Sequence, residues 1–457
     1  MDEFFLYEHG SGITFPGDLE ELQSHLETIW QQRLNERFTD FWRESEAGGQ
    51  RFLKIGPQAE IRARNYVGFI RDPQYTIHLL PKLYVGKTAH ISPESCLEQF
   101  YQNILWWLSY TPFLQVPHHL SGMDAIQSDP IEIFIGLFAT LARKTLNQSL
   151  FQAYENRSDE LAVVRGRLDM PEYLRQCLTK ARLHRVYCRY DNFEIDNLLN
   201  RVIKRVTRCL IPWTRRALNR QKLEDILYIL DEVSDVSVQA QDCDRVQLNP
   251  MFEDYRPVLD YCRLFLQNSV SYAYKPELKC FSLLIPMERL FEQFLAGFLK
   301  THQAQITGLN RVEFQKSDMY LAEEVLLEGG TRPAFQMRHD LLLDFCGKPI
   351  LLDAKYKQLK PGQSDSGVSQ SDLYQMLAYA VRRGVRHCGL IYPQVSEETA
   401  PISRAYRIPL PQESEHVNIL ANQIPFVHES LHEGALNPEG PLLRALMGLL
   451  ENLLLRQ

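Results

Sequence analysis

Two aspartates and a lysine in the last third of the chain are the residues best suited to chemistry. Asp340 lies in one apolar run and Asp353 and Lys355 lie in the next, within residues 337–358 (MRHDLLLDFCGKPILLDAKYKQ). Both runs have the apolar character of β-strands, and the Gly-Lys-Pro segment between them, residues 347–349, is typical of a tight turn. The pattern predicts a β-hairpin with charge confined to a few positions.

The expected hairpin brings these side chains to one face. Pairing about the turn places Asp340 opposite Lys355 and Leu342 opposite Asp353. Because side chains alternate along a strand, Asp353 and Lys355 project together while Ala354 points away, which leaves the Ala354 carbonyl as a further oxygen ligand. We therefore expect Asp340, Asp353 and Lys355 to converge.

Convergent carboxylates on an apolar hairpin favour a metal site. Charges are costly to bury without partners, and a divalent cation would be such a partner. Hard oxygen ligands suit Mg²⁺ or Mn²⁺ rather than Zn²⁺, and such an ion activates water and stabilises the charge that develops on a phosphodiester. Lys355 would then orient or deprotonate the water. The alternative is a solvated hairpin with a surface Asp–Lys pair, which the D-x-K spacing alone does not exclude.

Several stretches carry a resemblance to a known family. His339-Asp340 with LLDAKYK at residues 351–357 resembles the PD-(D/E)xK nuclease signature. Together with QSDLYQMLAYA it resembles the McrC family, the nuclease subunit of GTP-dependent, modification-directed restriction systems. Further stretches agree in order along the chain: NYVGF, LLPKLY, VRGRLDM and MERLFEQFL. The resemblance implies a Mg²⁺- or Mn²⁺-dependent endonuclease acting on double-stranded DNA, with an AAA+ GTPase ring of the McrB type as partner.

The resemblance also assigns roles to individual residues. It implies that Asp340, Asp353 and the Ala354 carbonyl hold the metal and that Lys355 acts on the water. Glu292 in LFEQF matches a helical glutamate that often faces the metal in PD-(D/E)xK folds. The alternative for Glu292 is a solvent-facing helical position.

Two further positions near the signature need comment. Gln375 resembles the family's Tyr-Gln pair, whose amide could contact the scissile region. His339 stands where the signature usually has proline, which leaves Asp344, on the same strand face, as a competitor of Asp340 for the role of first metal ligand.

Composition describes an ordinary globular protein. The chain has 457 residues, enough for about three domains, with 45% hydrophobic and 23% charged residues. No apolar run reaches the ~18 residues of a membrane span, and the first residues are acidic, unlike a signal peptide, so we expect a cytoplasmic protein. Nine cysteines without a C-x-x-C pair favour reduced core residues. A net charge of −7 gives no global sign of nucleic-acid binding.

The patterning predicts an α+β multidomain protein. Residues 1–91 read as a β-rich module, residues 92–275 as a mainly helical region with a basic segment, and residues 276–457 as a further domain. The resemblance implies that the first module docks the partner and that the last domain is the nuclease. The resemblance makes this last part an α/β PD-(D/E)xK restriction-endonuclease-like domain. A C-terminal helix at residues 442–456 has an apolar face broad enough for the sheet or for a second subunit.

Arginines alternate with apolar residues on a strand of the first module. Arg62 and Arg64 lie on one face of this strand. The resemblance implies that the N-terminal part of McrC-type proteins enters the pore of the GTPase ring and stimulates hydrolysis, a role that guanidinium groups suit. Arg62 and Arg64 are therefore candidates for partner binding, and a solvated sheet face is the alternative.

A basic segment in the middle of the chain is a candidate DNA contact. Residues 160–220 contain fourteen Lys and Arg against six Asp and Glu. Four of the basic residues recur at helical spacing opposite an apolar stripe: Arg201, Lys204, Arg205 and Arg208. Such a face could meet phosphates, although a solvated helix face is equally consistent with the pattern.

Two other functions remain open. No G-x-x-x-x-G-K-S/T sequence occurs, so nucleotide chemistry must lie on a partner chain. The chain could be a catalytically silent activator or adaptor of the ring, or a stand-alone nuclease in DNA repair. A self-dimer through the nuclease domain is expected if one site per chain must cut both strands.

Overall fold

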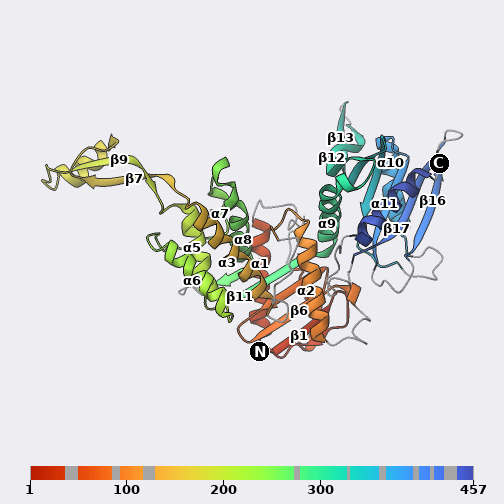
Figure 1. The fold of residues 1–457 in the computed structure, drawn as a ribbon, viewed down its shortest axis with the longest axis horizontal. Helices are drawn as coiled ribbons and strands as arrows, with labels where there is room; N and C mark the ends of the chain where they lie inside the picture. Colours follow the sequence, from red (N-terminus) through yellow and green to blue (C-terminus); the bar gives the residue numbers. More distant parts are fainter. Residues whose placement is uncertain are drawn as a thin grey trace.

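The computed structural model describes ten segments of the chain: residues 2–35, 50–84, 93–116, 129–271, 278–326, 330–359, 367–394, 401–411, 416–426 and 440–455. Within these segments the molecule has a body, an arm that projects from it, and a last unit built on a separate sheet (Figure 1).

The body is built on a five-stranded sheet with the order β1-β6-β5-β11-β10. Its strands are β1 (Asp2–Tyr7), β5 (Tyr66–Arg71), β6 (Tyr75–Leu80), β10 (Ser269–Ser271) and β11 (Leu278–Pro286). A small sheet, α1 and short 3-10 turns accompany it: β2 (Ile13–Thr14), α1 (Leu19–Asn35), β3 (Leu53–Ile55), η1 (Pro57–Ala59), β4 (Glu60–Ala63) and η2 (Lys82–Tyr84). Every residue of β5 and β6 is buried, which explains their nearly continuous apolar sequences.

The body sheet crosses the expected domain boundary. Strands β10 and β11 come from residues 269–286, yet they complete the N-terminal sheet, with β11 antiparallel to β5. The close pairing depends on Gly68, because a Cβ there would lie 1.9 Å from the Leu283 carbonyl oxygen. The boundary expected between residues 275 and 276 is therefore corrected: the chain returns to the body before entering the last unit.

Helices pack around the body sheet. The first two begin at Pro93 and Pro130, at a position where proline is tolerated, and Trp106 and Trp107 are buried in the core. The helices and helical turns of this region are α2 (Pro93–Ser109), α3 (Pro130–Gln148), α5 (Leu198–Leu210), α6 (Ala217–Ile229), α7 (Asp242–Arg245), η5 (Pro250–Tyr255) and α8 (Arg256–Gln267).

The arm interrupts the helical region. A three-stranded sheet with the order β7-β9-β8 extends away from the helices (Figure 1). It comprises β7 (Ala153–Leu161), β8 (Arg167–Leu168), α4 (Met170–Glu172), η4 (Tyr173–Leu178) and β9 (Val186–Glu194). Gly166 adopts φ +67, and a Cβ there would lie 2.5 Å from the Arg189 carbonyl oxygen, so the close approach of the two backbones requires glycine.

The last unit is a six-stranded mixed sheet with the order β12-β13-β14-β15-β17-β16. Its strands are β12 (Leu309–Val325), β13 (Thr331–Phe345), β14 (Lys348–Ala354), β15 (His387–Gln394), β16 (Ser403–Pro409) and β17 (His416–Pro425). The helices are α9 (Met287–Thr301), η6 (Gln303–Gln305), α10 (Gln370–Arg383) and α11 (Gly440–Leu455). Helices α9 and α11 share one apolar core with the sheet, and α10 forms a second core with the opposite face.

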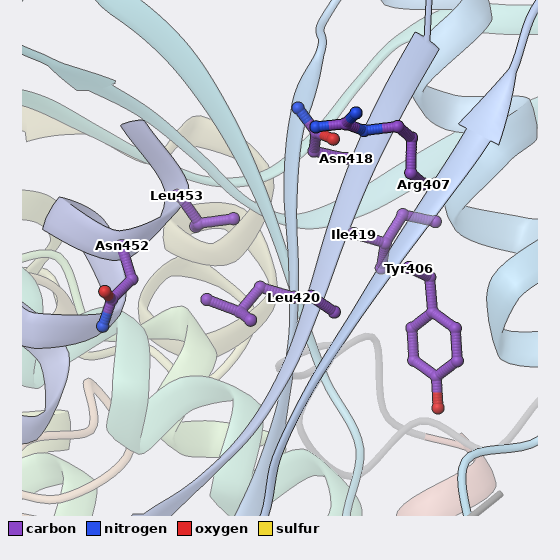
Figure 2. A pocket seen from close by; sticks show the side chains of 8 residues that line it. Tyr406, Arg407, Asn418, Ile419, Leu420, Asn452 and Leu453 are labelled. Carbon is purple, nitrogen blue, oxygen red and sulfur yellow. The ribbon is translucent and has the colours of Figure 1, made fainter. Parts of the chain in front are cut away.

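A pocket of about 230 Å³ lies between α11 and the β16–β17 end of the sheet (Figure 2). Leu420 and Leu453 line it together with the polar side chains Arg407, Asn418 and Asn452. Because β15 separates β14 from β17, this pocket is remote from the expected metal ligands. Among the residues that the structure describes, no helix combines the length and apolar character needed to cross a bilayer.

Candidate functional site

The β13–β14 hairpin carries the expected acidic residues, but its register differs from the expected one. Leu341 pairs with Leu352 and Phe345 with Lys348, so the two-residue turn is Cys346-Gly347, whose φ angles of 53° and 74° are those of a type I′ turn. The expected pairing about Gly347-Lys348 is therefore wrong by two residues, and the next pair along the ladder sets Asp340 opposite Asp353. A shift by two preserves the strand face, so the expected convergence survives.

The structure brings Asp340, Asp353 and Lys355 together. Asp340 Oδ2 accepts a hydrogen bond from the Ala354 amide at 2.8 Å. Asp353 Oδ2 lies 2.6 Å from Lys355 Nζ, and the same ammonium donates to Gln375 Oε1 at 2.9 Å. The four side chains come from β13, the end of β14 and the first turns of α10.

Burial dominates the electrostatics of this cluster. Asp353 is only 2% exposed, and burial raises its pKa despite the adjacent Lys355 ammonium. Burial, with the charges of Asp353 and Glu292, raises the pKa of Asp340 well above its usual range. Burial also raises the pKa of Glu292 to about 7, with Asp353 adding to the shift and Arg289 opposing it. Glu292 therefore belongs to the acidic cluster, although it lies on the opposite side of the sheet from α10.

The donor set can be tested against the requirements of a cation. In the described segments no group of three His, Cys, Asp or Glu side chains is arranged to hold a metal ion. Mg²⁺ does not need such a group, because it keeps several waters and commonly takes one or two carboxylates from the protein. Asp340 and Asp353, on adjacent strands and with raised pKa values, are a carboxylate pair whose ionised forms a cation would favour. The two carboxylates therefore fit Mg²⁺ or Mn²⁺, and the part expected of the Ala354 carbonyl as a further ligand stays a prediction.

One face of α10 supports the lysine. Gln375, Tyr379 and Arg383 recur every four residues: Gln375 Nε2 donates to Tyr379 Oη at 3.0 Å, and Arg383 Nε donates to His339 Nε2 at 3.2 Å. The Tyr379 ring lies 4.7 Å from the His339 ring. Sequence reasoning missed Tyr379 and Arg383, although their i, i+4 spacing from Gln375 was the available signal. His339, in place of proline, fills a buried position without displacing Asp340.

Asp344 lies at the turn. Its Oδ1 accepts hydrogen bonds from the Gly347 amide at 3.0 Å and from Asn310 Nδ2 at 3.2 Å, and the ladder sets it opposite Pro349. Asp344 therefore shapes the hairpin turn, four residues along the strand from Asp340. Helix α10 begins at Gln370, with Ser369 as its N-cap.

The basic helix α5 differs from the expected phosphate-binding face. Lys204 is buried, and its ammonium donates to the carbonyls of Leu230, Asp231 and Val233 at 2.6–3.0 Å. The expectation that Lys204 lies on an exposed face is therefore wrong, because the ammonium caps the chain that leaves α6.

The remaining basic side chains of α5 are more accessible than Lys204. Arg201 donates to Asp196 at 2.7 Å, Arg208 pairs with Asp235, and Arg205 is half-buried. A contact between these three arginines and DNA stays a prediction.

The arginines of the first module lie on β4 and just beyond it. Arg62 is ion-paired with Glu60 at 2.8 Å, and its side chain is half exposed. Ile61 and Ala63 between the charged residues are buried, as the alternation predicts. Arg64 is partly exposed, and its amide donates to the Phe52 carbonyl. Their role in partner binding stays a prediction.

Comparison with known proteins places the chain in a family. Residues 61–393 match the family model described as "McrBC 5-methylcytosine restriction system component". A search of curated proteins gives no match. A chain in a structure of Thermococcus gammatolerans McrB AAA+ hexamers with bound McrC, a refined half-complex from a tetradecameric assembly, has 19% identity and a TM-score of 0.65, over 98% of this chain and 99% of that one.

A chain of the Thermococcus gammatolerans McrBC complex, determined by cryo-electron microscopy, shares 21% identity over 66% of this chain and 88% of that one, with a TM-score of 0.46. The first of these two structures shows the same fold over nearly the whole chain. With the family model covering most of the sequence, including the hairpin, the chain belongs to the family of McrBC 5-methylcytosine restriction system components.

Proposed function

We propose that the chain is the Mg²⁺-dependent DNA endonuclease subunit of a GTP-dependent restriction complex directed at modified DNA, and that it stimulates a partner AAA+ GTPase of the McrB type. The observation that carries the nuclease proposal is the convergence of Asp340 and Lys355 with the buried Asp353 on the β13–β14 hairpin. This is the arrangement that a PD-(D/E)xK restriction-endonuclease-like domain requires, and the six-stranded sheet flanked by helices is consistent with that fold.

The residues of the site divide the work. Asp340 and Asp353 would hold a Mg²⁺ ion, which when bound would polarise the phosphodiester and lower the pKa of the attacking water. Lys355 is held between Asp353 and Gln375, which fixes its ammonium beside the carboxylates, where it would orient the attacking water. Glu292, with a pKa of about 7, can hold or release a proton near neutral pH.

The arm is the better candidate for the contact with a ring. Insertion into a pore needs a narrow projecting element, and residues 153–194 form one, whereas Arg62 lies on the body and is paired with Glu60 (Figure 1). The arm also exposes large apolar side chains that its own sheet does not cover: Tyr154, Val163, Val164, Met170, Leu174, Leu178, Leu183 and Phe193. Exposed apolar groups of this kind mark interaction surfaces.

Substitution of the hairpin tests the nuclease proposal. We expect Asp353→Ala and Lys355→Ala each to abolish Mg²⁺-dependent cutting of modified DNA by the complex, while GTP turnover by the ring stays at the wild-type rate. A cooperative melt first shows that each variant folds. Cutting at the wild-type rate by either variant contradicts the nuclease assignment. A wild-type chain that stimulates the ring but never cuts identifies a silent activator instead.

GTP turnover tests the partner contact. We compare Tyr154→Ser/Phe193→Ser in the arm with Arg62→Ala/Arg64→Ala in the body, both in the full chain. The Tyr154 and Phe193 rings are 5.0 Å apart and are 75% and 54% exposed, so their loss removes apolar contact area without opening a core. We expect the arm variant to lose more stimulation. The reverse order would return the contact to the Arg62–Arg64 strand.

A further inference from the structure

Three of the stretches that the sequence analysis singled out meet where the body joins the last unit. LLPKLY supplies Lys82 from the turn η2, MERLFEQFL supplies Phe291 from α9, and LLDAKYK supplies Tyr356 just after β14. The candidate nuclease chemistry uses Glu292, next to Phe291, and Lys355, next to Tyr356. It leaves Lys82 without a role.

Lys82, Tyr356 and Glu8 are bonded to one another. Tyr356 Oη donates to Glu8 Oε2 at 3.1 Å, and Lys82 Nζ donates to the Tyr356 carbonyl at 2.9 Å and lies 4.2 Å from the centre of the Tyr356 ring. The Lys82 amide donates to Glu8 Oε2 at 3.3 Å. Gln358 Nε2 donates back to the Lys82 carbonyl at 3.1 Å. Glu8 and Lys82 come from the body, whereas Tyr356 and Gln358 come from the last unit.

Burial makes this contact specific. Glu8 is 2% exposed and Tyr356 is 3% exposed, so their polar atoms cannot exchange partners with water freely. A buried polar group that loses its partner carries the full cost of desolvation, which holds the three side chains in one geometry. The contact is therefore a fixed joint rather than a loose surface association.

The body also reaches the site along a second route. Strand β11 belongs to the body sheet and runs directly into α9, whose first amide, that of Met287, donates to the Asn65 carbonyl at 3.2 Å. Phe291 on α9 packs beside Tyr356, with ring centres 6.3 Å apart. Both the helix that carries Glu292 and the strand end that carries Lys355 are thus anchored on the body.

We propose that Glu8, Lys82 and Tyr356 form a clamp that positions Lys355 against Asp353, so that phosphodiester cleavage in the last unit depends on the body holding the end of β14. This proposal rests on the proposed nuclease function. On the far side of the strand, the Lys355 amide donates to the Ile391 carbonyl at 2.8 Å, which fixes the backbone against β15. The clamp fixes the next residue from the opposite direction. A displacement of even ~1 Å at a reacting group lowers a rate on the order of 100-fold.

Lys82→Met is the principal test, because it keeps the apolar stem over the Tyr356 ring and removes the ammonium. Lys54→Met, at an exposed position on β3, is the matched control. We expect Lys82→Met to lower kcat for DNA cutting by about 10- to 100-fold with KM for DNA changed less than about twofold, since the clamp orients the chemistry and does not bind substrate. Glu8→Gln, which keeps a hydrogen-bond acceptor, should retain more activity than Glu8→Leu.

Amide hydrogen exchange in the full chain measures how firmly the clamp holds the end of β14, and it does not require DNA cleavage. We expect Lys82→Met to accelerate exchange across residues 353–358 and to leave β17 at its wild-type rate. Tyr356→Phe removes only the hydrogen bond to Glu8 and should accelerate exchange less. This variant replaces Lys82→Met as the test if Lys82→Met does not fold.

The two readouts separate the possible failures. Faster exchange with unchanged kcat overturns the positioning role, and unchanged exchange overturns the clamp itself. If the wild-type chain does not cut DNA, the proposed function fails, and the exchange rates alone still decide whether the body holds the end of β14.

Discussion

Helix α5 and the β13–β14 hairpin both carry several ionisable side chains, but they differ in how well those side chains are paired. On α5 the Lys204 ammonium is bonded to three carbonyls, and Arg208 is paired with an aspartate of the same chain. On the hairpin, Asp340 and Asp353 lie on one strand face, and Glu292 on α9 interacts with them electrostatically. Burial raises the pKa of all three carboxyl groups, so the neighbouring cations do not offset the cost of burial. A local excess of charge in the sequence therefore does not show whether the fold gives each charged group a partner.

The largest effect should come from the hairpin. We expect Asp340→Asn to lower Mg²⁺-dependent cutting by at least about 1,000-fold, because a carboxylate that holds the metal is worth several kcal/mol to the transition state. Asp344→Asn is the matched control. Asp344 lies four residues from Asp340 on the same strand face, and its side chain bonds the hairpin turn. We expect it to cut nearly as well as the wild type. Equal losses in single-turnover cutting would show that the two carboxylates share the role.

Lys204 should matter for stability rather than for DNA binding. Lys204→Met removes the ammonium from three carbonyls, of which those of Leu230 and Val233 are buried, so we expect the free energy of unfolding to fall by about 2–4 kcal/mol. Arg208→Met, which breaks an exposed ion pair on the same helix, should cost less than about 1 kcal/mol. Urea denaturation of both variants measures the difference. Equal costs would contradict the distinction between the buried and the exposed cation.

Much of the site could be predicted from the sequence because strand alternation is a strong local signal. The hairpin, the shared face of Asp340 and Asp353, and the buried stripe of α9 all follow from periods of two and 3.6 residues. The pairing register of β13 and β14 could not be predicted from the sequence, because a shift by two residues leaves the same apolar side chains on the same face. The type I′ turn at Cys346-Gly347 had no Asn-Gly or Asp-Gly signature.

The rest of the fold depended on contacts between distant segments. Nothing local marks β11 as a strand of the N-terminal sheet, and the arm was expected within a mainly helical region although it is a β-sheet. Lys204 was misplaced because helical periodicity assigns every lysine opposite an apolar stripe to solvent. The burial of Lys204 depends on the segment that follows α6, because the carbonyls of that segment accept hydrogen bonds from the Lys204 ammonium.

His78 is a second buried basic residue, and burial keeps its imidazole neutral. Its Nδ1 bonds Tyr101 Oη at 2.7 Å, and within the described residues its Nε2 has no hydrogen-bond partner. Burial, with a contribution from Arg71, lowers the pKa of His78 to about 3. The Lys204 side chain, also buried, instead donates hydrogen bonds to three carbonyls.

The pH dependence of stability should show this neutral histidine. The unfolded chain protonates His78 below about pH 6.5, whereas the folded chain does not until near pH 3. Its contribution is therefore fully present above about pH 6.5 and is lost as pH falls, by about 1.4 kcal/mol per unit. We expect His78→Gln to have a shallower fall in unfolding free energy between pH 6.5 and 5. An unchanged slope would mean that the folded protein binds this proton.

The smallest effect should be on the salt dependence of DNA binding. Each phosphate contact changes the slope of log affinity against log salt by roughly 0.9, so three arginines that met phosphates would change it by nearly three. Arg201 and Arg208 already hold Asp196 and Asp235, and turning to DNA would leave those carboxylates without their cations. We therefore expect the triple replacement Arg201→Ala/Arg205→Ala/Arg208→Ala to change the slope by less than about one unit. Fluorescence anisotropy over a range of salt concentrations measures it. A change near three units would show that the α5 arginines leave their carboxylate partners and contact phosphates when DNA binds.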